Sequence, residues 1–303
     1  MPRISNPPSP LVARLAGVHL FGFDAAPCSQ RVACALAEKG LQRHRSVRWD
    51  DTRSATLTAP PGTYIFRQVS LIRQDHLSAD YAAIQPNMVV PALVHDGQLH
   101  IESMDIVAYL DEIVPAPALM PQDPARAALV HELVDRGKAL HVAVRYVSFH
   151  WGLGRLGKLN AATEARLREL ERDGSPEQLV AFYSGFNHDS IDAAEYLRHL
   201  RALEDGYAAQ EARLRSDGRP YLTGDTFTMA DILWCMKVMR ILECGYPFAA
   251  RYPALAAWFE RVRARPAFHD GVMRHHRGMH LVFRVKAAIE RLLGRGIRRA
   301  AAA

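Results

Sequence analysis

The chain has 303 residues, with 38 lysines and arginines against 32 acidic residues, and a formal net charge of +6 at pH 7. A hydrophobic content of 49% and a charged content of 23% are typical of a globular protein and exclude an intrinsically disordered chain. The net positive charge invites a nucleic-acid-binding interpretation. However, residues 274–303 hold eight lysines and arginines and one glutamate. The rest of the chain is almost neutral, so no nucleic-acid partner is expected.

The cysteines are too few for a disulfide scaffold, and none forms a C-x-x-C pair, which excludes a zinc ribbon and a dithiol redox motif. They are Cys28, Cys34, Cys235 and Cys244. This pattern favours a reducing, cytoplasmic location. Residues 1–16 are Pro-rich, with Arg14 inside their apolar run, and predict an N-terminal extension rather than a signal peptide. No stretch approaches the ~20 apolar residues needed to span a bilayer.

Residues 17–114 predict a compact α/β domain with a mixed sheet, in the order β-α-β-α-β-β-α. In chain order we expect a strand over 17–23, a helix over 28–39, a strand within either 43–49 or 64–72, a short helix from 78, a hairpin over 89–101 and a helix from 103. The segment TRSATLTAPPG (52–62) is rich in Thr, Pro and Gly and predicts a loop insertion. Asp96-Gly97 is a strong hairpin-turn signal.

Residues 115–123 are Pro-rich and predict a linker, after which no segment shows convincing strand alternation. We therefore expect an all-helical domain over 124–273 and a basic extension over 274–303. The predicted helices of these two regions cover roughly 124–150, 161–172, 176–184, 190–216, 228–243, 253–264 and 279–294. Thr228 and Asp231 have the spacing of a helix capping box, to which we assign no chemistry.

Cys28 is the first candidate reactive residue, because it opens the first predicted helix in the run Pro27-Cys28-Ser29-Gln30-Arg31. Free backbone N–H groups and the positive end of the helix dipole lower the pKa of a thiol at such a position. Arg31, one turn on, adds positive potential. Ser29 is the alternate, as a hydroxyl donor to a bound thiolate or as a helix cap. A buried, inert cysteine is the other interpretation.

Two more candidates lie at element boundaries. A proline in an apolar strand belongs at an edge, and if Pro91 is cis, the N–H and C=O of Val90 turn outward to pair with an extended ligand backbone. Glu102 and Ser103 open the next helix, where a helix N-terminus and a hydroxyl suit a carboxylate and Glu102 suits an ammonium group. An ordinary N-cap is the alternative for this pair.

Five runs together resemble the cytosolic glutathione transferases: FDAAPCSQRVACALAEKG, DHLSADYAAIQPN, VVPALVHDG, ESMDIVAYLDE and PYLTGDTFTMADILW. The resemblance covers roughly residues 17–113 and 191–270. The sequence looks most similar to the branch of tetrachlorohydroquinone dehalogenases and ganglioside-induced differentiation-associated proteins. This implies a thioredoxin-like N-terminal domain that binds glutathione, then an all-α domain that forms the second-substrate pocket. It also implies a homodimer.

The resemblance further implies roles for single residues. Cys28 matches the nucleophilic cysteine of the dehalogenases, and Ser29 matches the serine after it. For glutathione, it implies Val90 beside a cis Pro91 for the cysteinyl backbone, Glu102 and Ser103 for the γ-glutamyl group, and His76 for the glycyl carboxylate.

Three departures from the family pattern bear on function. Ala26 stands where the dehalogenases have serine, and Gln85 and Met88 stand where asparagine and glycine are usual. We expect an enzyme that uses glutathione on a small hydrophobic, aromatic electrophile, by conjugation, reductive removal of a leaving group, or thiol transfer through Cys28. The alternative is a non-catalytic glutathione-binding adaptor that docks on a membrane or a protein through its basic C-terminal helix.

Two motifs are expected to carry no chemistry. The run G-x-G-x-x-G at 152–157 follows a helical stretch rather than a strand, so we do not expect a dinucleotide site. His275, His276 and His280 have helical spacing but lie among arginines without a carboxylate cluster, so we expect no metal site.

Residues 279–299 predict a basic amphipathic helix. One face of its helical wheel carries Leu281, Val282, Val285, Ala288, Ile289, Leu292 and Leu293, and the other carries Arg284, Glu290, Arg291, Arg295 and Arg298, with Phe283 as the exception. Such a helix either packs its apolar face onto its own domain or lies on an anionic membrane. The second interpretation predicts peripheral membrane contact through 279–299.

Overall fold

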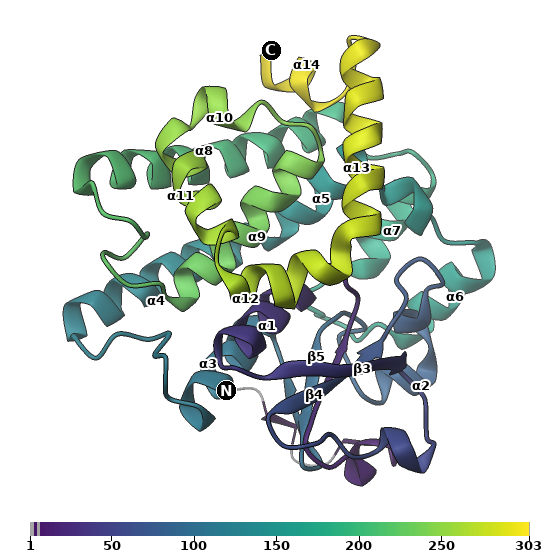
Figure 1. Ribbon diagram of the computed structural model, residues 1–303. Helices are drawn as coiled ribbons and strands as arrows, with labels where there is room; N and C mark the ends of the chain where they lie inside the picture. Colours follow the sequence, from purple (N-terminus) through teal and green to yellow (C-terminus); the bar gives the residue numbers. More distant parts are fainter. Residues whose placement is uncertain (1–2, 5–6, 303) are drawn as a thin grey trace.

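The computed structural model describes residues 3–4 and 7–302 (Figure 1). Its strands all lie within residues 3–101 of the described chain, and helices alone follow. This confirms the predicted fold class, a thioredoxin-like α/β domain followed by an all-α domain. The proposed boundaries at 16, 114, 123 and 273 stay predictions.

Six strands of the described chain form one mixed sheet in the order β1-β6-β5-β2-β4-β3. Their bounds are β1 (Arg3–Ile4), β2 (Val18–Gly22), β3 (Gln42–Arg48), β4 (Thr63–Gln68), β5 (Ala92–His95) and β6 (Gln98–Ile101). The β4 strand pairs in parallel with both β2 and β3, whereas β5 is antiparallel to β2 and β6. The β1 strand lies in the predicted N-terminal extension and pairs antiparallel with β6.

The sequence predicted a strand in only one of two segments, and both are strands. The β3 strand lies at the edge of the sheet with most of its side chains exposed, so it lacks an apolar alternation. Arg67 of β4 is fully buried and holds the start of the 52–62 insertion against the sheet. Its guanidinium donates to the carbonyl oxygens of Trp49 and Asp51, just before the insertion, and of Thr56 within it, at 3.2, 2.8 and 2.6 Å.

One edge of this sheet collects the predicted ligand-binding segments. Because β2 and β4 are parallel, both end at the same edge, and Ala92 at the start of β5 pairs with Phe21 of β2 and Ile101 of β6. Three chain segments therefore begin next to one another: the α1 helix (Pro27–Glu38), the loop before β5, and the α3 helix (Ser103–Ile113). The η3 turn (Asp75–Leu77) and α2 (Ala79–Ala82) follow β4 at that edge.

The predicted helices of the second domain are present, with one split. The expected helix over 124–150 breaks at Leu140 into α4 and α5. The bounds are α4 (Pro124–Ala139), α5 (His141–Trp151), α6 (Ala161–Leu170), α7 (Leu179–Asn187), α8 (Ala193–Asp217), α9 (Met229–Glu243), α10 (Phe248–Arg251), α11 (Pro253–Arg263), α12 (Pro266–Phe268), α13 (Arg274–Leu292) and α14 (Ile297–Ala302). A 3₁₀ turn, η4 (Gly154–Gly157), occupies the glycine motif after α5.

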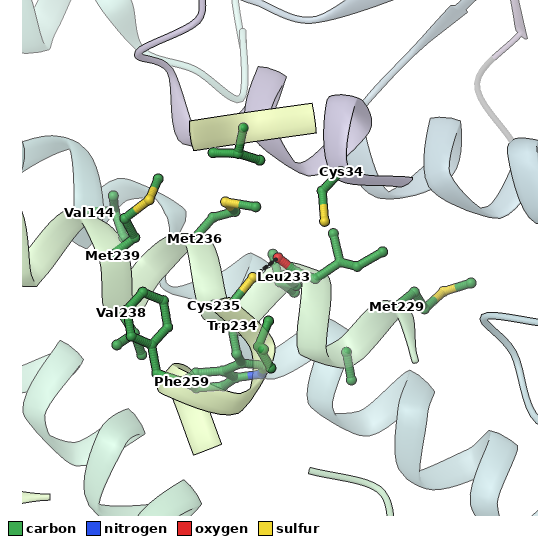
Figure 2. Packing of buried hydrophobic residues seen from close by; sticks show 14 of the residues in the cluster. Cys34, Val144, Met229, Leu233, Trp234, Cys235, Met236, Val238, Met239 and Phe259 are labelled. Atoms are coloured by element: carbon green, nitrogen blue, oxygen red, sulfur yellow. Dashed lines mark hydrogen bonds between the residues drawn. The ribbon is translucent and has the colours of Figure 1, made fainter. Parts of the chain in front are cut away.

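The α9 helix is the central element of the second domain, with nearly all of its residues buried. Figure 2 shows its side chains packed from both sides, with Cys34 of α1 pointing toward Leu233 and Cys235. Its N-terminus has the predicted capping box between Thr228 and Asp231. Packing of α9 against α1 thus joins the two domains through one continuous core.

The α13 helix does not pack by its apolar face. His276 and Phe283 are its buried residues, whereas Leu281, Val285 and Leu292 are 60%, 51% and 86% exposed. The interpretation that the apolar stripe packs onto its own domain is therefore wrong, because the side that carries His276, Phe283 and Lys286 faces inward. No helix in the described ranges is long and apolar enough to cross a membrane.

We predict that Asp231→Ala lowers the free energy of unfolding by about 3 kcal/mol. The fully buried Asp231 carboxylate accepts hydrogen bonds from Leu222 N, Thr228 N and Trp258 Nε1 at 3.0, 2.9 and 2.8 Å. Its removal leaves three donors unpaired in the core. Urea denaturation followed by tryptophan fluorescence measures the change, and the exposed Asp225→Ala is the matched control. Equal loss in both variants would contradict the assignment.

Candidate active site

A cavity of about 570 Å³ opens between the ligand-binding edge of the sheet and the helical domain. Both domains contribute to it. Residues of its wall that bear on chemistry are Cys28, Arg31, His76, Val90, Pro91, Glu102, Ser103, His141, Arg145, Glu177 and Arg240. The structure thus brings six of the seven predicted site residues to one cavity.

Cys28 lies at this cavity in the first turn of α1, with a partly exposed side chain. Arg31 Nη1 lies 3.5 Å from Cys28 Sγ, and His141 Nδ1 lies 3.8 Å from it. Burial alone raises the pKa of the Cys28 thiol, but the positive charges of Arg31 and His141, with Lys237 behind them, lower that pKa to about 6. Cys28 is therefore a thiolate at neutral pH.

The other three cysteines have the opposite chemistry. Cys34, Cys235 and Cys244 are buried, and burial raises the pKa of each thiol well above its ordinary value. The inert-cysteine interpretation fits these three and does not fit Cys28.

Arg31 connects Cys28 to the start of α3. It is 3% exposed, and the same Nη1 donates to Ser103 Oγ at 3.1 Å. Its Nε and Nη2 atoms have no hydrogen-bond partner within the described chain. Two buried, unpaired guanidinium donors at a cavity wall fit an anionic ligand.

His141, the first residue of α5, lies between Cys28 and Glu177, a contact that the sequence did not reveal. Its Nε2 lies 3.8 Å from Glu177 Oε2, and Arg145 binds the same carboxylate. Burial raises the pKa of Glu177, but hydrogen bonds and charge from His141 and Arg145 lower it to about 2. The nearby Cys28 thiolate raises the pKa of His141. Cys28 and Glu177 thus flank His141 on two sides, and both favour its protonated form.

The peptide bond between Val90 and Pro91 is cis. Neither the N–H nor the C=O of Val90 has a hydrogen-bond partner in the described ranges, although the neighbouring Val89 O accepts from Tyr81 and Pro91 O accepts from Gln85. A free N–H and C=O at the cavity fit an extended peptide backbone.

Glu102 lies at the same cavity, with a backbone φ of 65°. Asn87 Nδ2 donates to its Oε1 at 3.2 Å. Burial raises the pKa of the Glu102 carboxyl, and the Glu177 carboxylate raises it further. A ligand ammonium group here relieves both effects, so Glu102 and Ser103 together fit an α-amino acid group.

His76 is 4% exposed at the far side of the cavity, and burial lowers its pKa to about 4. Its imidazole is neutral at pH 7, and its Nδ1 has no partner among the described residues. This leaves one ring nitrogen for a ligand carboxylate.

The structure does not bring Ser29 to the cavity. Its side chain is 1% exposed, and its Oγ accepts a hydrogen bond from Phe23 N at 3.1 Å. Adjacent residues of a helix point about 100° apart, so Ser29 points back to the end of β2 while Cys28 points to the cavity. This geometry does not support Ser29 as a donor to a thiolate.

The three departures from the family pattern, Ala26, Gln85 and Met88, all line the cavity. Met88 has a φ of 52°, a left-handed conformation that favours glycine, and it lines the cavity. Gln85 Oε1 accepts from Asn87 N at 3.0 Å while its Nε2 donates to Pro91 O at 3.3 Å. Gln85 thereby fixes the loop that carries the cis bond.

His275, His276 and His280 do not form a single cluster. Glu243 of α9 meets His276 and His280 with its Oε1 at 2.5 and 3.0 Å, while His275 lies apart, near Arg43 and Asp24. The structure corrects the expectation that no carboxylate is close. A separation of 2.5 Å is that of a short hydrogen bond, and Arg240 Nη1 lies 3.4 Å from Glu243 Oε2, so the cluster fits a hydrogen-bonded ion pair better than a cation site.

Comparison with known families agrees with this geometry. The models of the glutathione S-transferase N-terminal and C-terminal domains match residues 20–118 and 177–266. A maleylacetoacetate isomerase of Rattus norvegicus is 30% identical over 72% of this chain and 76% of its own length. The chain belongs to the glutathione S-transferase family. Membership in this family confirms the predicted enzyme class and glutathione as cosubstrate.

Other proteins similar to this chain are named for different reactions. A 2,5-dichlorohydroquinone reductive dechlorinase of Sphingobium indicum is 25% identical over 84% of this chain and 82% of its own. The structure of β-etherase LigF from Sphingobium sp. strain SYK-6 has a TM-score of 0.68 at 20% identity, covering 84% of this chain and 98% of its own. This last likeness shows the fold. The predicted likeness to ganglioside-associated proteins stays a prediction.

We predict that Cys28 alone reacts with iodoacetamide in the native protein, at a rate that halves as the pH falls to about 6. The thiolate is the reactive form, and its pKa is about 6. Mass spectrometry of peptides after pulses at pH 4.5–8.5 gives the profile. In His141→Gln we expect the midpoint to rise by about one unit, because a cation within 4 Å is lost.

The matched control is His150→Gln, an exposed histidine on the same helix. Its profile is expected to follow the unsubstituted protein. A midpoint near the ordinary thiol value in the unsubstituted protein, or the same shift in both variants, would contradict the role assigned to His141.

Proposed function

We propose that this protein is a glutathione-dependent thiol transferase that removes glutathione reductively from adducts of small aromatic electrophiles, with Cys28 as its nucleophile. The observation that carries the proposal is the charge-stabilised Cys28 thiolate at a cavity shared by both domains. Neither Ala26 nor the inward-facing Ser29 offers a hydroxyl that could donate to the thiolate of bound glutathione, which makes Cys28 the better candidate for the attacking sulfur.

In the first step, the Cys28 thiolate attacks the sulfur of a glutathionyl thioether, R–SG. An S–S bond forms between Cys28 and glutathione, the C–S bond breaks, and its electron pair goes to the carbon of R. His141, whose pKa is raised by Cys28 and Glu177, donates the proton that converts this carbon to R–H.

In the second step, His141 takes the proton of a second glutathione thiol. The resulting thiolate attacks the glutathione sulfur of the Cys28 mixed disulfide and releases oxidised glutathione. Cys28 returns to its thiolate and His141 to its imidazolium. The balance is R–SG plus glutathione giving R–H plus oxidised glutathione, so carbon is reduced and sulfur is oxidised.

Glutathione is proposed to lie along the sheet edge. The free N–H and C=O of Val90 pair with its cysteinyl backbone, and Glu102 with Ser103 binds the γ-glutamyl ammonium and carboxylate. His76 binds the glycyl carboxylate through its unpaired Nδ1. The unpaired backbone of Val90, the unpaired Nδ1 of His76 and the raised pKa of the Glu102 carboxyl support the arrangement.

The second substrate is proposed to lie against the helical side of the cavity. There, Phe149, Tyr183 and Phe283 line the wall, and Phe149 stacks edge-on against Tyr183. Aromatic walls favour an apolar or aromatic ligand.

A cytoplasmic location and a homodimer remain part of the proposal. Four free cysteines support a reducing compartment. Dimerisation is expected from the family.

We predict that oxidised glutathione adds one glutathione to Cys28, and that a phenacyl thioether of glutathione is converted to acetophenone. Intact-mass spectrometry and product chromatography measure the two reactions. Cys28→Ala is expected to lose both, because the attacking sulfur is gone.

Ser29→Ala is the matched control and is expected to retain both reactions, since Ser29 faces β2. Fast conjugation of an activated aryl chloride by Cys28→Ala, with no thioether cleavage by the unsubstituted protein, would overturn the proposal in favour of simple conjugation. The non-catalytic alternative would require that neither reaction occurs.

A further inference from the structure

The α13 helix presents a continuous apolar stripe to solvent. Its large exposed side chains are Leu281, Val282, Val285, Ile289, Leu292 and Leu293. Their spacing of three, four and seven residues places them on one side of three helical turns. Scattered exposed leucines are ordinary, but a contiguous stripe of this size marks a contact surface.

Arginines follow one edge of the same stripe. Arg277, Arg284 and Arg291 recur every seven residues beside it, and Arg295, Arg298 and Arg299 follow the end of the helix. All six are exposed, and none forms an ion pair with a described residue. The single acidic residue of the 274–303 extension, Glu290, is partly buried and bound to Lys286 at 2.7 Å. The outward face of α13 therefore carries apolar side chains flanked by arginines, and the charges on it are all positive.

The inner face explains why the stripe cannot turn inward. His276 and His280 bind Glu243, Lys286 Nζ donates to Trp151 O at 2.7 Å, and Phe283 lies under the Arg240 guanidinium at 4.6 Å. Rotating α13 to bury its leucines would break all of these contacts. In Figure 1, α13 runs along the outside of the helical domain, and the stripe residues are exposed to solvent there.

We propose that this face of α13 docks on the surface of an anionic phospholipid bilayer. The leucines and valines enter the acyl boundary while the flanking arginines bind lipid phosphates. A second copy of the chain is a poorer occupant, because a two-fold interface would set one arginine row against the other. A nucleic acid offers no partner to the leucines. The proposal is independent of the chemistry at Cys28.

The test is flotation of the full chain with vesicles of phosphatidylcholine, or of phosphatidylcholine with phosphatidylserine. We expect binding only to the phosphatidylserine vesicles, weakened by salt. Arg284→Gln/Arg291→Gln is expected to lower the partition coefficient about thirtyfold, since two cations near the anionic surface are lost. The matched control, Arg166→Gln/Arg172→Gln, removes two exposed arginines elsewhere and is expected to bind like the unsubstituted chain.

A second variant, Val285→Glu/Ile289→Glu/Leu292→Glu, tests the apolar stripe and is expected to abolish flotation. The alkylation profile of Cys28 reports whether each variant keeps its fold. Absence of binding to phosphatidylserine vesicles at low salt would overturn the proposal. So would a glutamate variant that binds vesicles normally but changes from a dimer to a monomer in sedimentation, because the stripe would then be an interface between copies.

Discussion

The thiolate of Cys28 depends on a balance that neither domain achieves alone. Burial at the cavity opposes the charged form of the thiol, and Arg31 from α1 and His141 from α5 reverse this effect. Arg31 belongs to the sheet domain and His141 to the helical domain, so their charges meet only when the domains are packed. A reactive cysteine therefore requires the whole fold, rather than a local motif.

Packing of α9 against α1 is what holds these groups together. Its buried side chains fill the space below α1, and Arg240, near its C-terminal end, reaches across to Ala25 O. The same helix carries Lys237, whose Nζ is buried without a hydrogen-bond partner in the described chain, and burial holds its pKa well below the ordinary value. An unpaired amine beside Arg31 and Cys28 adds to the cost of this interface, while Asp231 stabilises its start.

The sequence identified the candidate site residues that lie at the boundaries of helices and strands. Cys28, Val90 and Ser103 follow or precede strands that end at the same place, so local patterns marked them as candidates, and the resemblance to the glutathione transferases implied their roles. His141 and Glu177 had no such signal, because His141 follows a helix break at Leu140 and Glu177 lies in an irregular loop. Only tertiary packing brings them to Cys28. The edge strand β3 was ambiguous for a related reason, since backbone pairing places it there without an apolar pattern.

The orientation of α13 shows a limit of a different kind. Amphipathic periodicity gives the angle between the apolar and polar faces, but not which of them meets the protein. Here Glu243 decides, because Arg240 and the hydrogen bonds from His276 and His280 keep it ionised, with a pKa of about 2 despite the burial that raises it. The contacts of His276 and His280 with this buried carboxylate would be lost if α13 turned, so they hold the histidine side of the helix inward. The leucines are then exposed as a consequence, and the inner face supplies Phe283 and Met279 to the cavity that holds Cys28. One buried carboxylate thus fixes both the wall of the pocket and the apolar surface outside it.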